Sequence, residues 1–180
     1  FHDQAIALSK LREMVPDDID IFVKEHPTHF YRPKVGSRGR SPLFYNFLSN
    51  INGVKLVPQD ISSLELIKNS IFVATITGSV AFESAIIGKQ SLIFGDVWFN
   101  GCPNVNLWSP SLSFGDIINK DISTPNEIIE FLLTEHELYA VPGCLNGSCQ
   151  KKFAKYLNKN FHKEEFEGIL GLLKEFFLKL

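Results

Sequence analysis

The chain has 180 residues, of which 44% are hydrophobic and 21% are charged, and its formal net charge is −2. This composition supplies a core and excludes a disordered chain, and the length fits one domain or one lobe of a two-domain protein. The charge argues against binding nucleic acid by phosphate neutralisation, and no membrane span or signal peptide is visible. Because the chain begins at Phe1 inside an expected helix, we expect an N-terminal portion to precede it.

The first part of the chain alternates expected helices and strands. Apolar residues recur at helical spacing over 5–15, and the β-branched run 19–23 is typical of a strand. Residues 28–41 are rich in Pro, Gly, Ser and Arg, which predicts a long loop. A helix over 42–50 and a strand over 54–57 follow.

The middle of the chain continues this alternation. Ser62-Ser-Leu-Glu65 has the spacing of a capping box, so we expect a helix to begin there. Strands over 71–75 and 91–94 flank a helix over 80–87, with Gly88 as the residue that ends it. Continuous apolar strands joined by short connections are typical of a parallel sheet with helices on both faces. We therefore predict a Rossmann-like α/β fold.

The end of the chain is expected to be helical. Thr124-Pro-Asn-Glu127 has capping-box spacing and opens a helix to about Glu135. A loop is expected over 140–149. An apolar stripe near the C-terminus predicts an amphipathic helix, and its interspersed acidic residues favour a docked helix over a membrane-surface helix. We expect residues 1–180 to form a single Rossmann-like lobe with a C-terminal helical segment over 145–180.

The turn Thr77-Gly78-Ser79 lies between an expected strand and an expected helix. Such a turn brings backbone N–H groups and a helix N-terminus to one point, which suits a phosphate. Gly78 allows a ligand to approach the backbone closely, and Ser79 can cap the helix or donate to a phosphate oxygen. Glu83, one helical turn later, can accept hydrogen bonds from ribose or sugar hydroxyls. A merely capped helix stays open as the alternative.

The segment Lys24-Glu25-His26-Pro27 follows the first expected strand. His26 can donate to a phosphate, and Pro27 stiffens the turn that aims it. Lys24 and Glu25 are either a solvated pair or contribute one side chain to the cleft. His29 stands at H-x-x-H spacing from His26, but no third ligand suggests itself, so we expect no metal site.

Two further segments carry polar or aromatic residues. Residues 32–40 are locally basic and would meet an anionic ligand or, as we favour, lie in solvent; the cations are Arg32, Lys34, Arg38 and Arg40. In the turn over 95–101, Asp96 and Asn100 are candidates for ligand contacts. Trp98 and Phe99 would stack on a base or sugar or, as we favour, pack the turn.

The three cysteines fit a reducing compartment better than a disulfide framework, which predicts a cytoplasmic protein. Cys144 and Cys149 could share a disulfide or a metal, but no second pair of ligands stands nearby. We favour two ordinary thiols in a loop.

Three segments together resemble the capsule polysaccharide biosynthesis family. They are Val23-Lys-Glu-His-Pro27, Leu56-Val-Pro58 and the run from Thr77 to Gly95, in that order. That family is similar to GT-B glycosyltransferases, including sialyltransferases and Kdo transferases with "HP" and "SS" or "ST" motifs. The resemblance covers about residues 15 to 105.

The resemblance implies the C-terminal, donor-binding lobe of a two-lobed enzyme. It implies that His26 contacts the donor phosphate, that Thr77, Gly78 and Ser79 form the second phosphate-contacting motif, and that Glu83 is a carboxylate for the donor. Thr-Gly-Ser replaces adjacent serines, so the direct phosphate ligand stays open between Thr77 and Ser79. The catalytic base would come from the N-terminal lobe.

The leading hypothesis is inverting, metal-independent transfer from a nucleotide sugar, such as a CMP-linked acidic sugar, to a growing surface glycan. Its partners are the nucleotide sugar, a glycan acceptor and the missing N-terminal lobe, with other components holding it at the periphery of the inner membrane. No cofactor is expected, and the isolated lobe should be inactive or nearly so. The alternatives are a sugar-nucleotide epimerase of the same architecture and a non-catalytic module of the capsule machinery.

Overall fold

The computed structural model describes residues 3–26, 29, 40–139, 167–168 and 171. The chain forms two compact units, Phe1–Ile129 and Glu130–Leu180. The expected loop over 140–149 and both of its cysteines lie outside the described residues. The expected C-terminal segment 145–180 lies outside them too, apart from the helical residues Glu167, Gly168 and Gly171.

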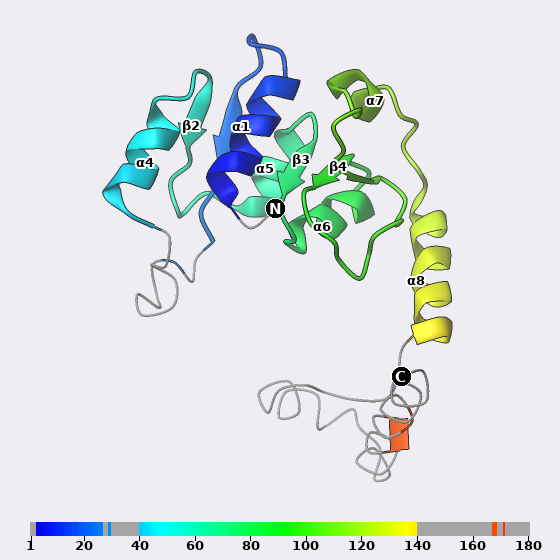
Figure 1. The fold of residues 1–180 in the computed structure, drawn as a ribbon. Helices are drawn as coiled ribbons and strands as arrows, with labels where there is room; N and C mark the ends of the chain where they lie inside the picture. The colour runs from blue at the N-terminus through cyan, green and yellow to red at the C-terminus, as the bar shows by residue number, and fades with distance from the viewer. Residues whose placement is uncertain (1–2, 27–28, 30–39, 140–166, 169–170, 172–180) are drawn as a thin grey trace. The chain divides into compact units, whose positions relative to one another are not determined.

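Helices and strands alternate along most of the described chain, and α8 continues from the first unit into the second (Figure 1). In chain order they are α1 (Gln4–Met14), β1 (Ile21–Val23), α4 (Pro42–Ser49), β2 (Val54–Leu56), α5 (Ser63–Asn69), β3 (Val73–Thr75), α6 (Val80–Ile86), β4 (Ser91–Ile93), β5 (Val105–Leu107), α7 (Phe114–Ile118) and α8 (Pro125–Tyr139).

The strands form two parallel sheets. β1 pairs with β2, with Ile21 opposite Val54. The second sheet has the order β3-β4-β5, with Ser91 of β4 between Val73 and Val105. The expected parallel α/β fold is confirmed, although the strands are divided between two small sheets. Because all strands in a sheet run in one direction, the turns that leave them gather at its carboxyl edge.

Helices cover both faces of the larger sheet. Leu92 lies in β4, and Phe94 is the residue that follows this strand. Both are buried in a core with Leu11 of α1 and Ile117 of α7. Ile93 is also fully buried, and as the alternate residue of the strand it points to the opposite face. On that face α6 packs against β3, β4 and β5. Ile21 of β1 packs against the same core as Leu92, so both sheets contribute to one core.

A network of buried amide side chains lies where β4 and β5 begin. Asn106 Nδ2 donates to Gln90 Oε1 over 2.9 Å, and Lys120 Nζ donates to Asn106 Oδ1 over 2.9 Å. Asn104 adopts φ 65, a left-handed conformation that is uncommon outside glycine. Its Nδ2 donates to Ala85 O, in α6, over 3.3 Å, and its Oδ1 accepts from Ser123 N over 2.8 Å. The network thereby ties the end of α6 to the start of β5.

The sequence-based signals at element ends were right at two places and wrong at a third. Gly88 follows Ile87, the C-cap residue of α6, and has φ +75, as predicted for the residue that ends this helix. Thr124 and Glu127 form the expected reciprocal capping contacts at the start of α8. Ser62 lies at the start of α5, but its side chain makes no capping hydrogen bond, so the capping box expected there is wrong.

Two elements, β5 and α7, were not predicted. β5 has the same apolar–polar–apolar pattern as β2, so the signal that predicted β2 could also have found β5. α7 has five residues, too few to establish a helical period. No helix within the described ranges is both long and apolar enough to cross a bilayer.

Candidate functional site at the carboxyl edge of the sheets

The turn after β3 is held by a threonine side chain. Gly78 N donates to Thr75 Oγ1 over 3.2 Å, and Ala81 N donates to Gly78 O over 3.2 Å. A Cβ atom on Gly78 would lie only 2.7 Å from Thr75 Oγ1. Glycine is therefore required here by the close approach of Thr75, and the Gly78 N–H already has an acceptor within the turn.

Ser79 is joined to Glu83 rather than to the helix end. Ser79 Oγ donates to Glu83 Oε1 over 2.8 Å, and both residues are exposed. Ser79 makes no side-chain capping bond to α6, so the alternative of a serine-capped helix is wrong. The structure thus brings two predicted site residues, Ser79 and Glu83, into direct contact.

The turn after β4 packs directly on the turn after β3. Gly95 N donates to Ile76 O over 2.9 Å, and a Cβ atom on Gly95 would lie 2.7 Å from Thr77 Cγ2. In the same turn, Asn100 Nδ2 donates to Asp96 Oδ1 over 2.6 Å. Thr77, Ser79, Glu83, Asp96 and Asn100 are all exposed, so the two converging turns present hydroxyl, carboxylate and amide groups to solvent.

The two aromatic residues of the β4 turn have different environments. Phe99 is 2% exposed, as the packing interpretation expects, whereas Trp98 is 61% exposed. Their rings lie 5.3 Å apart in an edge-to-face arrangement. The ring of Phe82, from α6, lies 5.3 Å from that of Trp98 and 5.7 Å from that of Phe99. Packing therefore explains Phe99 but not the exposure of Trp98.

The segment after β1 carries His26 at the edge of the other sheet. His26 is exposed, and its ring lies 6.4 Å from that of His29 in an edge-to-face arrangement. Lys24 Nζ donates to Gln59 O, just beyond β2, over 2.9 Å. This contact joins the ends of β1 and β2. Pro27 lies outside the described residues.

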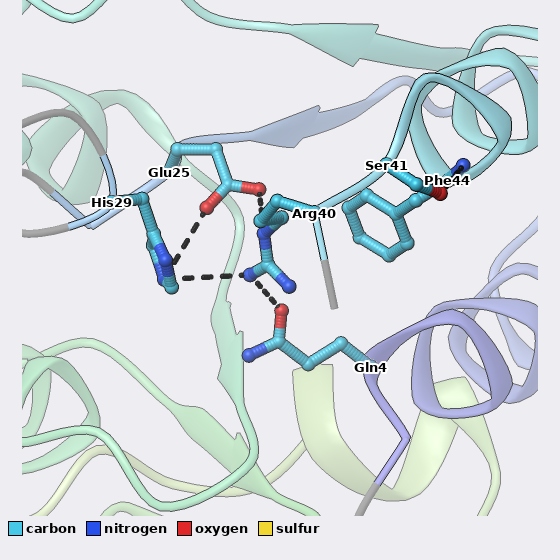
Figure 2. Close-up of polar contacts among 6 residues, drawn as sticks. All are labelled: Gln4, Glu25, His29, Arg40, Ser41 and Phe44. Carbon is cyan, nitrogen blue, oxygen red and sulfur yellow. Dashed lines mark hydrogen bonds and ion pairs between the residues drawn. The ribbon is translucent and has the colours of Figure 1, made fainter. Parts of the chain in front are cut away.

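Glu25 forms an ion pair with Arg40 (Figure 2). Arg40 Nε lies 2.7 Å from Glu25 Oε1, and the two side chains are only 11% and 10% exposed. Of the two alternatives for Lys24 and Glu25, the solvated pair is wrong, and so is the solvated role favoured for Arg40. Arg32, Lys34 and Arg38 lie outside the described residues.

Three further side chains surround the ion pair. His29 Nε2 lies 3.6 Å from Glu25 Oε2 and 3.5 Å from Arg40 Nη2, which also donates to Gln4 Oε1 (Figure 2). The guanidinium of Arg40 lies 4.6 Å from the ring centroid of Phe44. The cluster links the start of α1, the segment after β1 and the start of α4, and so fixes the turn that carries His26.

Sequence reasoning missed two parts of this edge. Phe82 was not singled out, although it stands between Ser79 and Glu83 at a spacing that puts all three on one side of a helix. The Glu25–Arg40 pair spans fifteen residues of sequence, and no local pattern indicates such a partner.

Two other kinds of functional group were considered among the described residues, a reactive cysteine and a metal-binding cluster. Burial raises the pKa of the Cys102 thiol to about 11, so this residue is a poor nucleophile at neutral pH. Across the described ranges there is no group of three or more His, Cys, Asp or Glu side chains that could hold a metal ion.

Comparison of the chain with protein-family models, with curated proteins and with solved structures finds no match. The geometry of the strand ends is therefore the basis for a functional proposal.

Proposed function

We propose that this chain is the donor-binding lobe of a nucleotide-sugar-dependent glycosyltransferase in capsule or surface polysaccharide biosynthesis. The observation that carries the proposal is the convergence of the turns after β3 and β4 beside the first turn of α6. Parallel α/β folds bind their ligands at this edge. The exposed hydroxyl of Ser79 and the carboxylate of Glu83 support a ligand rich in hydroxyl groups.

In this proposal the polar groups divide between the phosphate and the sugar or ribose of the donor. His26 donates to the donor phosphate, and Thr77 or Ser79 makes the second phosphate contact, with Gly78 shaping their turn. Glu83 accepts from ribose or sugar hydroxyls. Lys24 and Pro27 support the position of His26, the former through its contact beyond β2.

The proposed reaction is inverting and metal-independent. Negative charge grows on the departing phosphate as the bond to the sugar breaks, and hydrogen-bond donors fixed at that point stabilise it. His26 suits this role because Glu25, the neighbouring residue, is anchored by Arg40. The N-terminal lobe would supply the base and help bind the glycan acceptor. The enzyme would act in the cytoplasm, at the membrane periphery through other components.

The test is His26→Ala in the full-length protein. We expect transfer to fall at least about tenfold, the loss of roughly one charge-assisted hydrogen bond, while the thermal unfolding temperature stays unchanged. His136→Ala, on an exposed position of α8, is the matched control and should keep full activity. An unchanged rate of sugar transfer by the His26 variant would contradict the proposal. Incubation with candidate nucleotide sugars and no acceptor tests the epimerase alternative, because an epimerase needs no acceptor.

A second measurement addresses ligand binding directly. A ligand that binds only the native state raises the unfolding temperature. We expect CMP, UDP, GDP or one of their sugars to do so. A non-catalytic module need bind none of them, so a flat screen favours that alternative.

A further inference from the structure

We infer that Trp98 is a stacking platform for an uncharged sugar ring, placed at the carboxyl edge of β3 and β4. The inference deepens the proposed function and rests on it, because it takes the ring to be the sugar of the nucleotide-sugar donor. It starts from the exposed side chain of Trp98, which two other aromatic rings hold in place.

Trp98 is 61% exposed, although its neighbour Phe99 is 2% exposed. Burying a large aromatic side chain stabilises a fold, so a residue needed only to pack the turn would be expected inside. Phe99 already fills that role. The exposed indole of Trp98 contributes little to the core and is available for a ligand.

The indole is nevertheless held in place. Phe82 lies 5.3 Å from it in a tilted arrangement, and Phe99 lies 5.3 Å from it edge to face. Both supporting rings belong to well-packed elements, since Phe99 is buried and Phe82 lies on α6. An aromatic side chain already fixed by neighbours loses little conformational entropy when a ligand stacks on it.

Exposed polar groups belong to the same two segments as the supported ring, α6 with its first residues and the turn after β4. Ser79, Phe82 and Glu83 stand three and four residues apart, so the serine–glutamate pair and the aromatic support share one side of α6. Asp96 and Asn100 belong to the same turn as Trp98 and are bonded to one another over 2.6 Å. A carboxylate accepts several hydrogen bonds, so Glu83 and Asp96 keep acceptor capacity beyond these contacts.

This combination matches the two-sided chemistry of a pyranose. The C–H face of the ring stacks on an indole, while its hydroxyl groups donate to carboxylates and exchange hydrogen bonds with an amide. The two carboxylates repel an anionic ring, because like charges in proximity oppose binding. The platform therefore favours an uncharged sugar over the acidic sugar of the sequence-based hypothesis.

The test is a fluorescence titration of the 180-residue chain. It has two tryptophans, and Trp108 stacks on Phe94 at 5.9 Å. Trp108→Phe leaves Trp98 as the only indole. In this background we titrate UDP, GDP and CMP, each alone, linked to an uncharged hexose and linked to a sugar acid. An uncharged methyl glycoside is titrated beside them. Trp98→Ala and Trp98→Phe variants of the unmodified chain are titrated with the same ligands by calorimetry.

We expect one nucleotide linked to an uncharged hexose to change Trp98 emission and to bind more tightly than the plain nucleotide. Trp98→Ala should remove that advantage, about tenfold for one lost stacking contact, and Trp98→Phe should keep part of it. The sugar acid should bind more weakly than the hexose.

The remaining outcomes separate the two proposals. If nucleotides and nucleotide sugars bind equally well to native chain and Trp98→Ala, the platform is overturned and the donor-binding function stands. The same holds if the sugar acid binds best. If an uncharged methyl glycoside quenches Trp98 while no nucleotide binds, the indole still stacks on a sugar ring, but the glycosyltransferase proposal fails and the ring is not that of a donor. Binding by none of these ligands overturns both.

Discussion

The two ends of the β3-β4-β5 sheet use similar polar side chains in opposite ways. At the amino ends, Gln90, Asn104 and Asn106 are buried, and their amides bond to one another and to backbone carbonyls. At the carboxyl ends, Ser79, Glu83 and Asn100 are exposed, and their side chains bond to residues four positions away in the chain. α6 joins the two regions, because Asn104 bonds Ala85 near its end and Ser79 starts it.

The difference indicates which polar groups hold the fold and which are available for a ligand. A buried amide must have its partners inside the protein, since an unsatisfied one costs free energy. An exposed group is hydrated, so a ligand can replace the water. We therefore expect substitutions in the buried amide network to reduce stability, and substitutions on the exposed turns to reduce binding with little loss of stability.

The largest effect is expected for Asn104→Ala. The change removes the partner of Ser123 N and puts a Cβ-bearing residue without a side-chain amide into the left-handed region. Together these lower the free energy of unfolding by about 4 kcal/mol. Chemical denaturation measures it. Asn104→Gly tolerates the backbone conformation and should lose about 1 kcal/mol less. A loss below about 1 kcal/mol for alanine would contradict the role given to this network.

Arg40→Ala tests the cluster around Glu25 and Arg40, which lies at a carboxyl edge but is mostly buried, like the amide network. Removing the guanidinium leaves Glu25 mostly buried without its 2.7 Å partner, which should cost roughly 3 kcal/mol. Urea denaturation at neutral pH measures the loss. The double variant Arg40→Ala with Glu25→Gln removes the stranded charge and should recover part of it. If both variants are equally unstable, the ion pair is not what holds the turn of His26.

Gly95→Ala tests the convergence of the β3 and β4 turns. The added methyl group meets Thr77 Cγ2 at 2.7 Å and should destabilise the fold by about 2 kcal/mol. Thermal unfolding measures this. Thr77→Ser removes the opposing methyl group and keeps the hydroxyl, so it should restore much of the stability of Gly95→Ala. Without such rescue, the two turns do not pack as described.

The smallest effect is expected at an exposed capping box. Hydrogen bonds from the Thr124 backbone and side chain lower the pKa of Glu127 below its ordinary 4.5. Because the folded pKa is the lower one, this stabilisation is present above pH 4.5 and is lost as the pH falls through the folded value. Thr124→Ala should therefore lower the unfolding temperature slightly at pH 7, and its difference from the native chain should shrink as the pH falls through the folded pKa of Glu127. A pH-independent difference would contradict this origin.

The elements that depend on local chemistry could be predicted from the order of the residues alone. Short, largely apolar runs predicted four of the strands, because successive apolar side chains are typical of strands in a parallel sheet. Gly88 was identified as a helix end because glycine accepts a positive φ readily. The order of the elements led to the parallel α/β fold, and the strand-end turns marked the residues of the candidate site.

Which of those residues contact one another, and which side chains are exposed, depends on the tertiary structure. Nothing in the local pattern distinguishes Trp98 from Phe99 or pairs Glu25 with Arg40, because these outcomes depend on segments distant in the chain. The same is true of Gly95 against Thr77 and of the left-handed Asn104. Secondary-structure propensity depends on a few neighbouring residues, whereas the burial of a side chain and its bonding partners depend on how the whole fold packs.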